Sequence, residues 1–437
     1  MSILKTMYTG VSGINAEGEA LGVVGDNISN SNTVGFKGQR AIFADMLGHS
    51  VTAGTPSALP GSGVVMSQVE QMFTQGSLSN TGVSTDMALS GDGFFVVGGT
   101  VDGVQGQFFS RAGQMKIDAK GDITNLEGMQ LQGYKALGGG KFAAGVSGLQ
   151  VPTSALPPQA TTAMGITANL DANQTVLGGL TPPVPWDPTN PSKTSNFSTS
   201  MQVFDSLGNA HAVDVYMVKT AANAWDYHAL VDGGQLAGGT AGTNVEIGTG
   251  SLTFTSAGAL NTVNVSTAIS ANFNGANPNQ AINIDFGAPI ATGGTGLSGS
   301  TQFGSPSSVS TQKQDGYASG DLAGISVDGT GVVKGTYTNG QKLDVGQLAI
   351  AKFRSNEGLG RAGHNLWIAT RESGDAALGT AGSGGRGAVT GGALEQSNVD
   401  LATQFVDLIA HQRAFSANSK TITTADEMLQ EVVNLKR

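Results

Sequence analysis

Apolar residues recur every seven positions at both ends of the chain. The N-terminal row consists of Met7, Ile14, Leu21 and Ile28. The C-terminal row consists of Leu401, Leu408, Phe415, Ile422 and Leu429, with Phe405 on an offset row. A seven-residue period buries one stripe of a helix against a second helix. The pattern therefore predicts one helix over residues 3–28 and another over 398–435, the latter capped at its start by Asn398.

Four glycines interrupt the first of these helices, at positions 10, 13, 18 and 22. Each costs about 1 kcal/mol relative to alanine, so this helix is expected to order only when it is packed. Two arrangements satisfy the pattern. The two helices can pair in antiparallel fashion and close one globular domain, or both can pack against copies of themselves in an assembly.

Between the helical ends, short apolar runs alternate with turn residues. Trp225, Tyr227, Ala229 and Val231 alternate with other residues, as on a strand with one buried face. The pair Asp328-Gly329 is a strong hairpin signal. No helical pattern of about 12 residues separates the strands, which disfavours a parallel α/β fold. We predict a mainly β protein of antiparallel sandwiches or barrels with α-helical coiled-coil termini.

Composition shifts divide the β region. Residues 148–195 hold eight of the 13 prolines, and 232–310 are rich in small residues, which indicates an inserted domain. Residues 29–75 predict a largely irregular connection with an extended linker at 50–63, and 376–392 predict a flexible return linker. The predicted organisation is nested, with the terminal helices paired and the second antiparallel β-domain inserted in the first. Its parts are a terminal helical domain of 1–30 with 398–437, connecting segments of 31–67 with 376–397, a first β-domain of 68–147 with 301–375, and an outer β-domain of 148–300.

Composition and charge argue against several classes of function. Without cysteine the chain has no disulfide, thiolate metal site or cysteine nucleophile. A formal charge of −10, from 22 Lys and Arg against 32 Asp and Glu, disfavours binding to nucleic acid. No run approaches the roughly 18 apolar residues of a membrane span. The first 30 residues also lack the apolar run of a cleavable secretory signal. We therefore expect no membrane insertion and no cleaved signal peptide.

Candidate chemistry is sparse. The five histidines are scattered, and none has a second histidine at the i, i+4 spacing of a zinc-binding helix. Residues 358–363 match G-x-G-x-x-G, but 364–368 continue as a strand where a nucleotide site needs a helix. Acidic residues such as Asp92, Asp205 and Asp328 lie in turns. We predict no catalytic residue, metal or cofactor. A carbohydrate-active enzyme, which needs two carboxylates about 5–9.5 Å apart, stays open as an alternative.

Segments beside the predicted helices carry a specific pattern. The run G-D-N-I-S-N at 25–30, followed by N-T-V-G-F-K at 32–37, is similar to the N-N-I-A-N-x-x-T-x-G-(F/Y)-K signature of bacterial flagellar axial proteins. Asp26 replaces Asn and Ser29 replaces Ala. Residues 394–401, 412–420 and 424–429 also resemble that family, which comprises rod, hook and hook-associated proteins. The matching signature positions are Asn27, Asn30, Thr33, Gly35, Phe36 and Lys37.

Interior segments resemble the hook branch of this family. They are V-F-D-S-L-G-N at 203–209, Q-D-G-Y at 314–317, and G-L through H-N-L-W at 358–367, where His364 replaces an Asn. The resemblance implies a non-enzymatic subunit of a hollow tube, in which terminal helices form an inner coiled layer and β-domains face outward. On this view the heptad residues named above form the polymer interface. The alternatives are a distal rod or hook-associated protein, or a secreted β-rich adhesin.

The resemblance also implies partners and a location. The partners would be other copies of the chain, the rod and hook–filament junction proteins, the hook cap during assembly, and the type III flagellar export apparatus. The location would be the hook and basal body of the flagellum, outside the cell, where a universal joint transmits motor torque to the filament.

Overall fold

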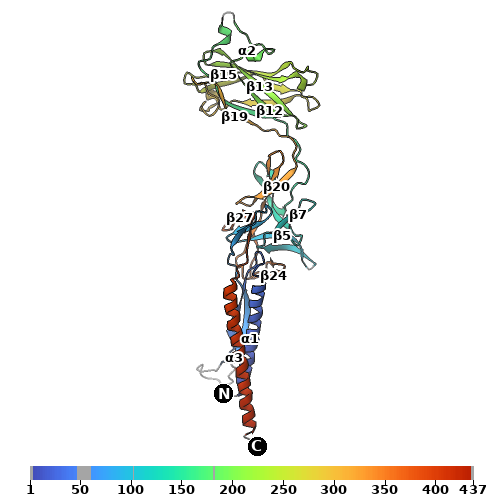
Figure 1. Cartoon of the computed structure of the whole chain (residues 1–437), viewed down its shortest axis with the longest axis vertical. Helices are drawn as coiled ribbons and strands as arrows, with labels where there is room; N and C mark the ends of the chain where they lie inside the picture. The colour runs from blue at the N-terminus through green and yellow to red at the C-terminus, as the bar shows by residue number, and fades with distance from the viewer. Residues whose placement is uncertain (1–2, 47–60, 102, 181–182, 435–437) are drawn as a thin grey trace. The chain divides into compact units, whose positions relative to one another are not determined.

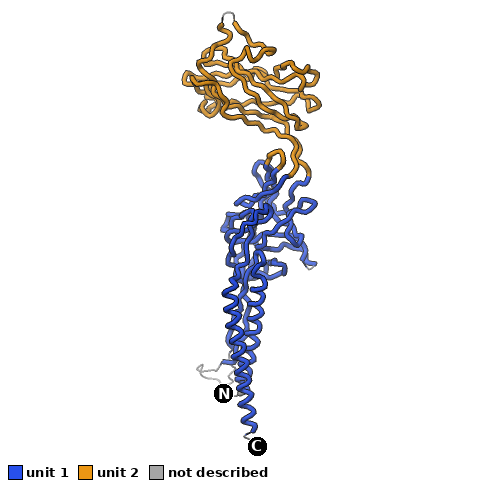
Figure 2. Tube along the Cα trace, in the orientation of Figure 1, with its two compact units in different colours: residues 1–153, 323–336, 342–437 blue, residues 154–322, 337–341 orange. Residues whose placement is uncertain are grey.

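The computed structural model describes residues 3–46, 61–101, 103–180 and 183–434. The chain divides into two compact units (Figure 2). Unit 1 comprises residues 1–153, 323–336 and 342–437, and unit 2 comprises 154–322 and 337–341. In the sequence, unit 2 is therefore inserted into unit 1.

Two long helices of unit 1 lie side by side, α1 (Ile3–Ser29) and α3 (Leu401–Asn434) (Figure 1). They run antiparallel, because Asn27 contacts Gln404 near one end of the pair and Gly10 approaches Ile422 towards the other. Both helices are those that the heptad rows predict. Burial of one face against the partner stabilises α1 in spite of its glycines.

The start of α3 differs from the sequence prediction. Asp400 caps the helix, since its Oδ1 accepts hydrogen bonds from the N–H groups of Ala402 and Thr403 at 2.8 and 3.2 Å. The prediction of an Asn398 cap is wrong, because the Asn398 side chain bonds to the backbone of neighbouring segments instead.

After α1, the chain forms an antiparallel hairpin of β1 (Gln39–Asp45) and β2 (Val64–Gln71), which packs along α1. The prediction of a largely irregular connection over 29–75 is therefore wrong for 39–45 and 64–71. The Asn and Gly residues that favour irregular backbone lie at 27–38, before the first strand. The two strands are stabilised by pairing with each other and by contact with the helix. Most of the linker predicted at 50–63 lies at 47–60, outside the described residues.

The remaining strands of unit 1 form one large sheet and two short strand pairs. The main path of the sheet runs β20-β21-β22-β9-β5-β6-β25-β24, and every pairing with a resolved register in it is antiparallel. Its strands are β5 (Phe94–Val101), β6 (Val104–Ser110), β7 (Met115–Ile117), β8 (Ile123–Asn125), β9 (Gln130–Gly138), β10 (Lys141–Gly148), β20 (Leu322–Val327), β21 (Val332–Tyr337), β22 (Lys342–Leu348), β23 (Ile350–Lys352), β24 (Gly360–Gly363), β25 (Leu366–Ile368) and β26 (Ala377–Gly379). The strand pairs are β3 (Leu78–Asn80) with β28 (Ala393–Glu395), and β4 (Met87–Ser90) with β27 (Ala388–Gly391).

Unit 2 contains two sheets that share one hydrophobic core. One sheet has the order β17 (Ile269–Ala271), β18 (Gln280–Asp285), β11 (Ala163–Asn169), β19 (Ser308–Gln314). The other has the order β12 (Phe197–Phe204), β13 (Ala210–Ala221), β14 (Ala224–Asp232), β15 (Asn244–Phe254), β16 (Leu260–Thr267). Short helical turns are η1 (Leu177–Gly179), α2 (Pro191–Thr194), η2 (Gly233–Gln235) and η3 (Ile290–Thr292). The β11–β18 pair is parallel, and the other strand pairs of these two sheets are antiparallel.

The alternating pattern on β14 is confirmed. Trp225, Tyr227, Ala229 and Val231 are buried in the core between the sheets of unit 2. The Trp225 indole N–H donates to Gln302 Oε1 at 3.0 Å, which satisfies its one polar atom. The predicted mainly β fold with helical termini is therefore confirmed.

Two glycine-rich segments form tight turns. Residues 358–363 lead into a hairpin of β24 and β25, in which His364 and Asn365 have φ of 50° and 60°, so the interpretation as a β-turn is confirmed. The prediction of a flexible linker at 376–392 is wrong. β26 pairs with β23 and β27 pairs with β4, and glycines at 382, 384 and 385 with positive φ form the turn between β26 and β27.

Candidate assembly interface

The face of α1 that packs against α3 lies one residue before the predicted row. We call this face the inner seam of α1; it consists of Gly10, Gly13, Glu17, Ala20, Val24 and Asn27. The predicted residues Ile14, Leu21 and Ile28 each follow a seam residue by one position, which is about 100° around the helix, and Met7 lies on the same predicted row. All four are half-buried. The seven-residue period is therefore present on α1, but the face that packs against α3 is not the predicted one.

On α3 the inner seam includes part of the predicted heptad row. It consists of Gln404, Leu408, His411, Asn418, Ile422, Ala425 and Leu429. The predicted residues Leu408, Ile422 and Leu429 are half-buried in it. The other predicted residues remain exposed, with 42% of Leu401, 52% of Phe405 and 37% of Phe415 accessible.

Further apolar side chains are exposed on both helices. We call the whole set the outer apolar residues, namely Leu4, Tyr8, Val11, Leu401, Phe405, Val406, Ile409, Phe415, Met428, Val432 and Val433. Such a concentration on one pair of helices is unusual for a soluble monomer, where exposed apolar residues tend to be scattered singly. The helices therefore present apolar surface that their mutual contact leaves uncovered.

Two of the contacts across the inner seam are polar. Asn27 Nδ2 donates to Gln404 Oε1 at 2.9 Å, and His411 Nδ1 lies 2.6 Å from Glu17 Oε2. Because a carboxylate accepts hydrogen bonds, Nδ1 of His411 carries the proton of this bond. Asn27 is almost fully buried, so its bond with Gln404 satisfies groups that would otherwise be costly to bury.

Two glycines permit the close approach of the helices. A Cβ atom on Gly13 would lie 2.5 Å from Asn418 Nδ2, and one on Gly10 would lie 2.8 Å from Ile422 Cγ1. At Gly18 and Gly22 a Cβ would meet open space. The glycines that weaken α1 alone are thus required at positions 10 and 13 by its packing against α3.

The signature segment begins as a set of local hydrogen bonds that ends α1. Asn27 accepts from the Gln39 N–H at 2.8 Å and donates to the Gln39 carbonyl at 2.7 Å, which ties α1 to the start of β1. Asn30 Nδ2 donates to the Asp26 carbonyl and to Asp26 Oδ1, and Thr33 Oγ1 donates to Asn30 Oδ1. These side chains shape the turn after the helix.

The second half of the signature reaches the far end of the chain. Gly35 has φ of +69°, its N–H donates to the Glu395 carbonyl at 2.7 Å, and a Cβ there would lie 2.6 Å from backbone atoms of Arg111 and Ala112. Phe36 is buried. Glycine is therefore required at position 35 by both conformation and space.

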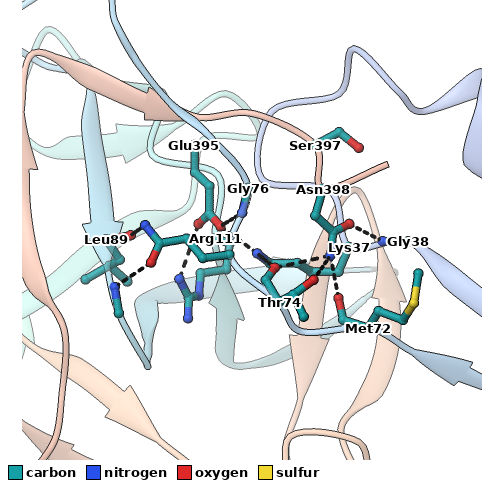
Figure 3. Close-up of polar contacts among 12 residues, drawn as sticks. Lys37, Gly38, Met72, Thr74, Gly76, Leu89, Arg111, Glu395, Ser397 and Asn398 are labelled. Atoms are coloured by element: carbon teal, nitrogen blue, oxygen red, sulfur yellow. Dashed lines mark hydrogen bonds and ion pairs between the residues drawn. The ribbon is translucent and has the colours of Figure 1, made fainter. Parts of the chain in front are cut away.

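Lys37 belongs to a buried ion cluster with Glu395 and Arg111 (Figure 3). Lys37 Nζ lies 2.6 Å from Glu395 Oε1, and Arg111 Nη1 lies 3.2 Å from Oε2. The side chains of Lys37 and Glu395 are fully buried and that of Arg111 is 3% exposed. Burial lowers the pKa of Lys37 and of Arg111, and the Glu395 carboxylate opposes this shift by stabilising both cations.

Neighbouring backbone groups complete the cluster. The Gly76 N–H donates to Glu395 Oε1 at 2.9 Å, and Lys37 Nζ donates to the Thr74 carbonyl at 2.8 Å. Asn398 accepts from the Gly38 N–H and donates to the backbone at Thr74 (Figure 3). The residues before α3 are thereby joined to those after α1 and to the strand region between them.

Sequence reasoning did not identify Glu395 and Arg111 as structural partners of Lys37. One signal was available: Glu395 ends the run Ala393-Leu394-Glu395, where a charge follows residues that are typical of a buried strand. Arg111 gave no comparable signal, because its partner is 284 residues away in the sequence.

A cavity of about 480 Å³ adjoins the signature segment. Four of its lining residues form two pairs, since Arg361 Nη1 lies 3.7 Å from Asp26 Oδ2 and His364 Nδ1 lies 3.5 Å from Glu127 Oε1. Among the described residues, no three or more His, Asp or Glu side chains are grouped so that they could hold a metal ion. In the same part of the chain, no helix is long and apolar enough to cross a membrane.

The paired terminal helices and the β-rich units described above are assigned to a class by comparison with known families. Residues 7–37 match the family described as flagella basal body rod protein, and 390–435 match the flagellar basal body rod FlgEFG protein C-terminal family. Residues 88–169 match the flagellar hook protein FlgE/F/G D1 domain, and 169–317 match the flagellar basal body protein FlaE D2 domain. The chain is thus a structural component of the bacterial flagellum.

Relatives that match over nearly the full length show which branch of the flagellar axial proteins this chain belongs to. The chain is 37% identical over 434 residues to the flagellar hook protein FlgE of Salmonella typhimurium, covering 98% of each chain. It is 35% identical to that of Escherichia coli, covering 98% of each, and 32% identical to that of Treponema pallidum over the full length of both. The chain belongs to the flagellar hook protein FlgE family. The resemblance to the hook branch is therefore confirmed, and this is a family of structural proteins rather than enzymes.

A solved structure agrees in fold. The crystal structure of Helicobacter pylori flagellar hook protein FlgE2 superposes with a TM-score of 0.50 at 15% identity, covering 71% of this chain and 98% of that one. At this level of identity the match supports the fold, and the family assignment rests on the relatives described above.

Proposed function

We propose that this chain polymerises into the tubular flagellar hook, a flexible universal joint that transmits torque from the motor to the filament. The observation that carries the proposal is the set of outer apolar residues on α1 and α3. Fully burying one large apolar side chain contributes about 1.5–3 kcal/mol. Contacts with other copies would recover this free energy at every subunit of a tube.

The proposed interface consists of the heptad residues of both helices. They are Met7, Ile14, Leu21, Ile28, Leu401, Phe405, Leu408, Phe415, Ile422 and Leu429. Leu401, Phe405 and Phe415 are exposed and would contact other copies directly. The half-buried members would contribute their remaining surface and help to hold the helices in place. The signature residues at 27–37 would support the interface indirectly, because they shape the end of α1.

The domain division is also retained as a proposal. Residues 1–30 with 398–437 would form the inner tube, and 31–67 with 376–397 would connect it to the first β-domain of 68–147 with 301–375. Residues 148–300 would form the outer domain, although β19 at 308–314, beyond that boundary, pairs with β11 in the same unit. The two-sheet core of unit 2, which does not depend on either terminal helix, supports its role as a separate module.

Partners and location follow from the family. The chain would contact other copies, the rod and the hook–filament junction proteins, and the hook cap during assembly. It would reach the extracellular hook through the flagellar export apparatus without a cleaved signal peptide. The absence of cysteine suits passage as an unfolded chain, because no disulfide can form before folding. No catalytic role is proposed.

Electron microscopy of the purified chain at high concentration tests the proposal. We expect helically ordered tubes, and we expect deletion of 1–30 or of 400–437 to leave a soluble β-rich protein that does not polymerise. Phe405→Asn should strongly reduce assembly, because it removes an exposed apolar contact without disturbing the fold.

The matched control is Leu137→Asn, which removes an exposed apolar side chain at the end of β9, away from the helices. This variant should assemble normally. Failure of the unaltered chain to form tubes, or tubes of normal form from chains lacking either helix, would overturn the proposal.

A further inference from the structure

Each terminal helix carries two heptad faces next to one another. The inner seams of α1 and α3 face each other, and most of the outer apolar residues lie on other faces. Leu401 and Phe415 continue the seam row of Leu408 and are nevertheless exposed. Along α1 the inner seam and the predicted apolar row are one residue, or about 100°, apart. The helices could therefore pair through either face, and the structure leaves large apolar side chains such as Phe405, Val406 and Ile409 uncovered.

The inner seam has the composition of a selective contact rather than a strong one. On α3 the positions Gln404, His411 and Asn418 are seven residues apart and polar, where a coiled coil of maximal stability would have leucine or isoleucine. Their counterparts on α1 are Asn27, Glu17 and Gly13. Each polar group meets a partner of matching chemistry or size.

The charges around the seam support this matching. His411 faces the Glu17 carboxylate across the pair, with Asp407 one turn before it on α3. Arg40 of β1 lines a second cavity together with Asp407 and His411, and it is paired with Glu70 of β2. An apolar face brought against this seam would leave Asn27, Gln404 and Glu17 without those partners, which costs free energy for each buried polar group.

We infer that the polar inner seam is the specificity determinant of the helix pair: it restricts α1 and α3 to each other through this face, and thereby reserves the outer apolar residues for a second copy of the chain. The inference rests on the proposed polymer. In a tube, helices of many identical copies lie close together, and a wholly apolar seam would accept any apolar face. Polar residues at heptad positions specify partner and register at a cost in stability.

The first experiment makes the seam apolar. Gln404→Leu/His411→Leu in the full chain should replace tubes by irregular aggregates in electron micrographs. The matched control is Thr403→Leu/Ala410→Leu, which adds the same side chains at the same spacing on exposed positions. The control should still form tubes. Normal tubes from the first variant, or equal disruption by both, would overturn the inference.

The second experiment reverses the Glu17–His411 pair and measures the yield of an engineered intrachain disulfide. This yield does not depend on the formation of tubes. Because the chain has no cysteine, Gly13→Cys/Asn418→Cys introduces the two thiols of one possible disulfide across the seam. The close approach there, with a Gly13 Cβ 2.7 Å from Asn418 Cγ, allows a bond within one chain. In this background, His411→Glu should lower the yield of intrachain disulfide about tenfold, the factor that corresponds to about 1.4 kcal/mol.

Adding Glu17→His to His411→Glu should restore both the disulfide and the tubes, because the pair is re-formed in the opposite order. An unchanged disulfide yield with His411→Glu, or no recovery in the exchanged variant, would overturn the inference. If the unaltered chain forms no tubes, the proposed function fails, while the disulfide yields still decide whether the polar seam selects its partner.

Discussion

Replacement of Glu395 by Gln tests the junction between the two ends of the chain. The variant keeps the shape of the side chain and an oxygen that can accept from the Gly76 N–H. It removes the negative charge that Lys37 and Arg111 share, at 2.6 and 3.2 Å. Two buried cations then face an amide, and its NH2 group repels at least one of them.

The expected loss of folding free energy is large compared with the total stability of one folded domain. Breaking a buried ion pair by removing one partner costs about 3–5 kcal/mol, because an uncompensated buried charge remains. A native domain has a total stability of about 5–15 kcal/mol. Each 1.4 kcal/mol corresponds to about a factor of ten in an equilibrium constant, so opening of the junction should become about 100-fold or more frequent.

Hydrogen exchange measured by mass spectrometry on the full chain is the appropriate assay, since a chain of two units need not unfold in one step. Peptides covering 35–39, 72–77 and 393–398 should exchange faster in Glu395→Gln, while peptides from β13 and β14 in unit 2 serve as an internal reference. The control is Glu70→Gln, which removes a carboxylate paired with the largely exposed Arg40. Surface pairs contribute about 0–1 kcal/mol. Equal exchange in the two variants would refute the account of the buried cluster.

Two further predictions concern the strands of unit 1. Gly113→Ala should abolish normal folding of unit 1, because its Cβ would lie 1.5 Å from the Met87 carbonyl oxygen, whereas Gly106→Ala on β6 meets open space and should fold normally; circular dichroism and exchange of β4 peptides distinguish them. At Asp328, burial alone would raise the pKa, but hydrogen bonds from Thr330, Lys334 and Val332 lower it to about 2. The stabilisation is therefore present above the ordinary pKa of 3.8 and is lost as pH falls through about 2. The difference in unit 1 melting temperature between the unaltered chain and Asp328→Asn should shrink over that window, and a constant difference would contradict the assignment.

Local periodicity determined the elements that could be predicted. Heptads at both ends are sufficient to predict α1 and α3, since helix formation depends on residues three and four positions apart. Alternation on β14 and the turn at 328–329 likewise predict strands from neighbours in the sequence. The family resemblance is carried by segments beside the helices, and the relatives confirm it. These features need no knowledge of distant contacts.

The phase of the helix pair could not be predicted in the same way. On α1 the row that contains Met7, Ile14 and Leu21 is the more apolar, and the sequence favours it as the contact between the helices. The structure instead uses the row of Gly10, Gly13 and Asn27, where small and polar side chains fit those of α3. A period follows from one helix alone, whereas the choice of face depends on the shape and polarity of its partner.

The residues that join the chain ends illustrate the same limit. The sequence alone determined that this is a mainly β protein with helical ends and a flagellar signature that includes Lys37. That Lys37 is paired with Glu395, that 39–45 pairs with 64–71, and that 388–395 forms strands rather than a linker were decided by tertiary structure. Each of these depends on a partner far away in the sequence, and the free energy of burying a charge or completing a strand exists only when that partner is in place.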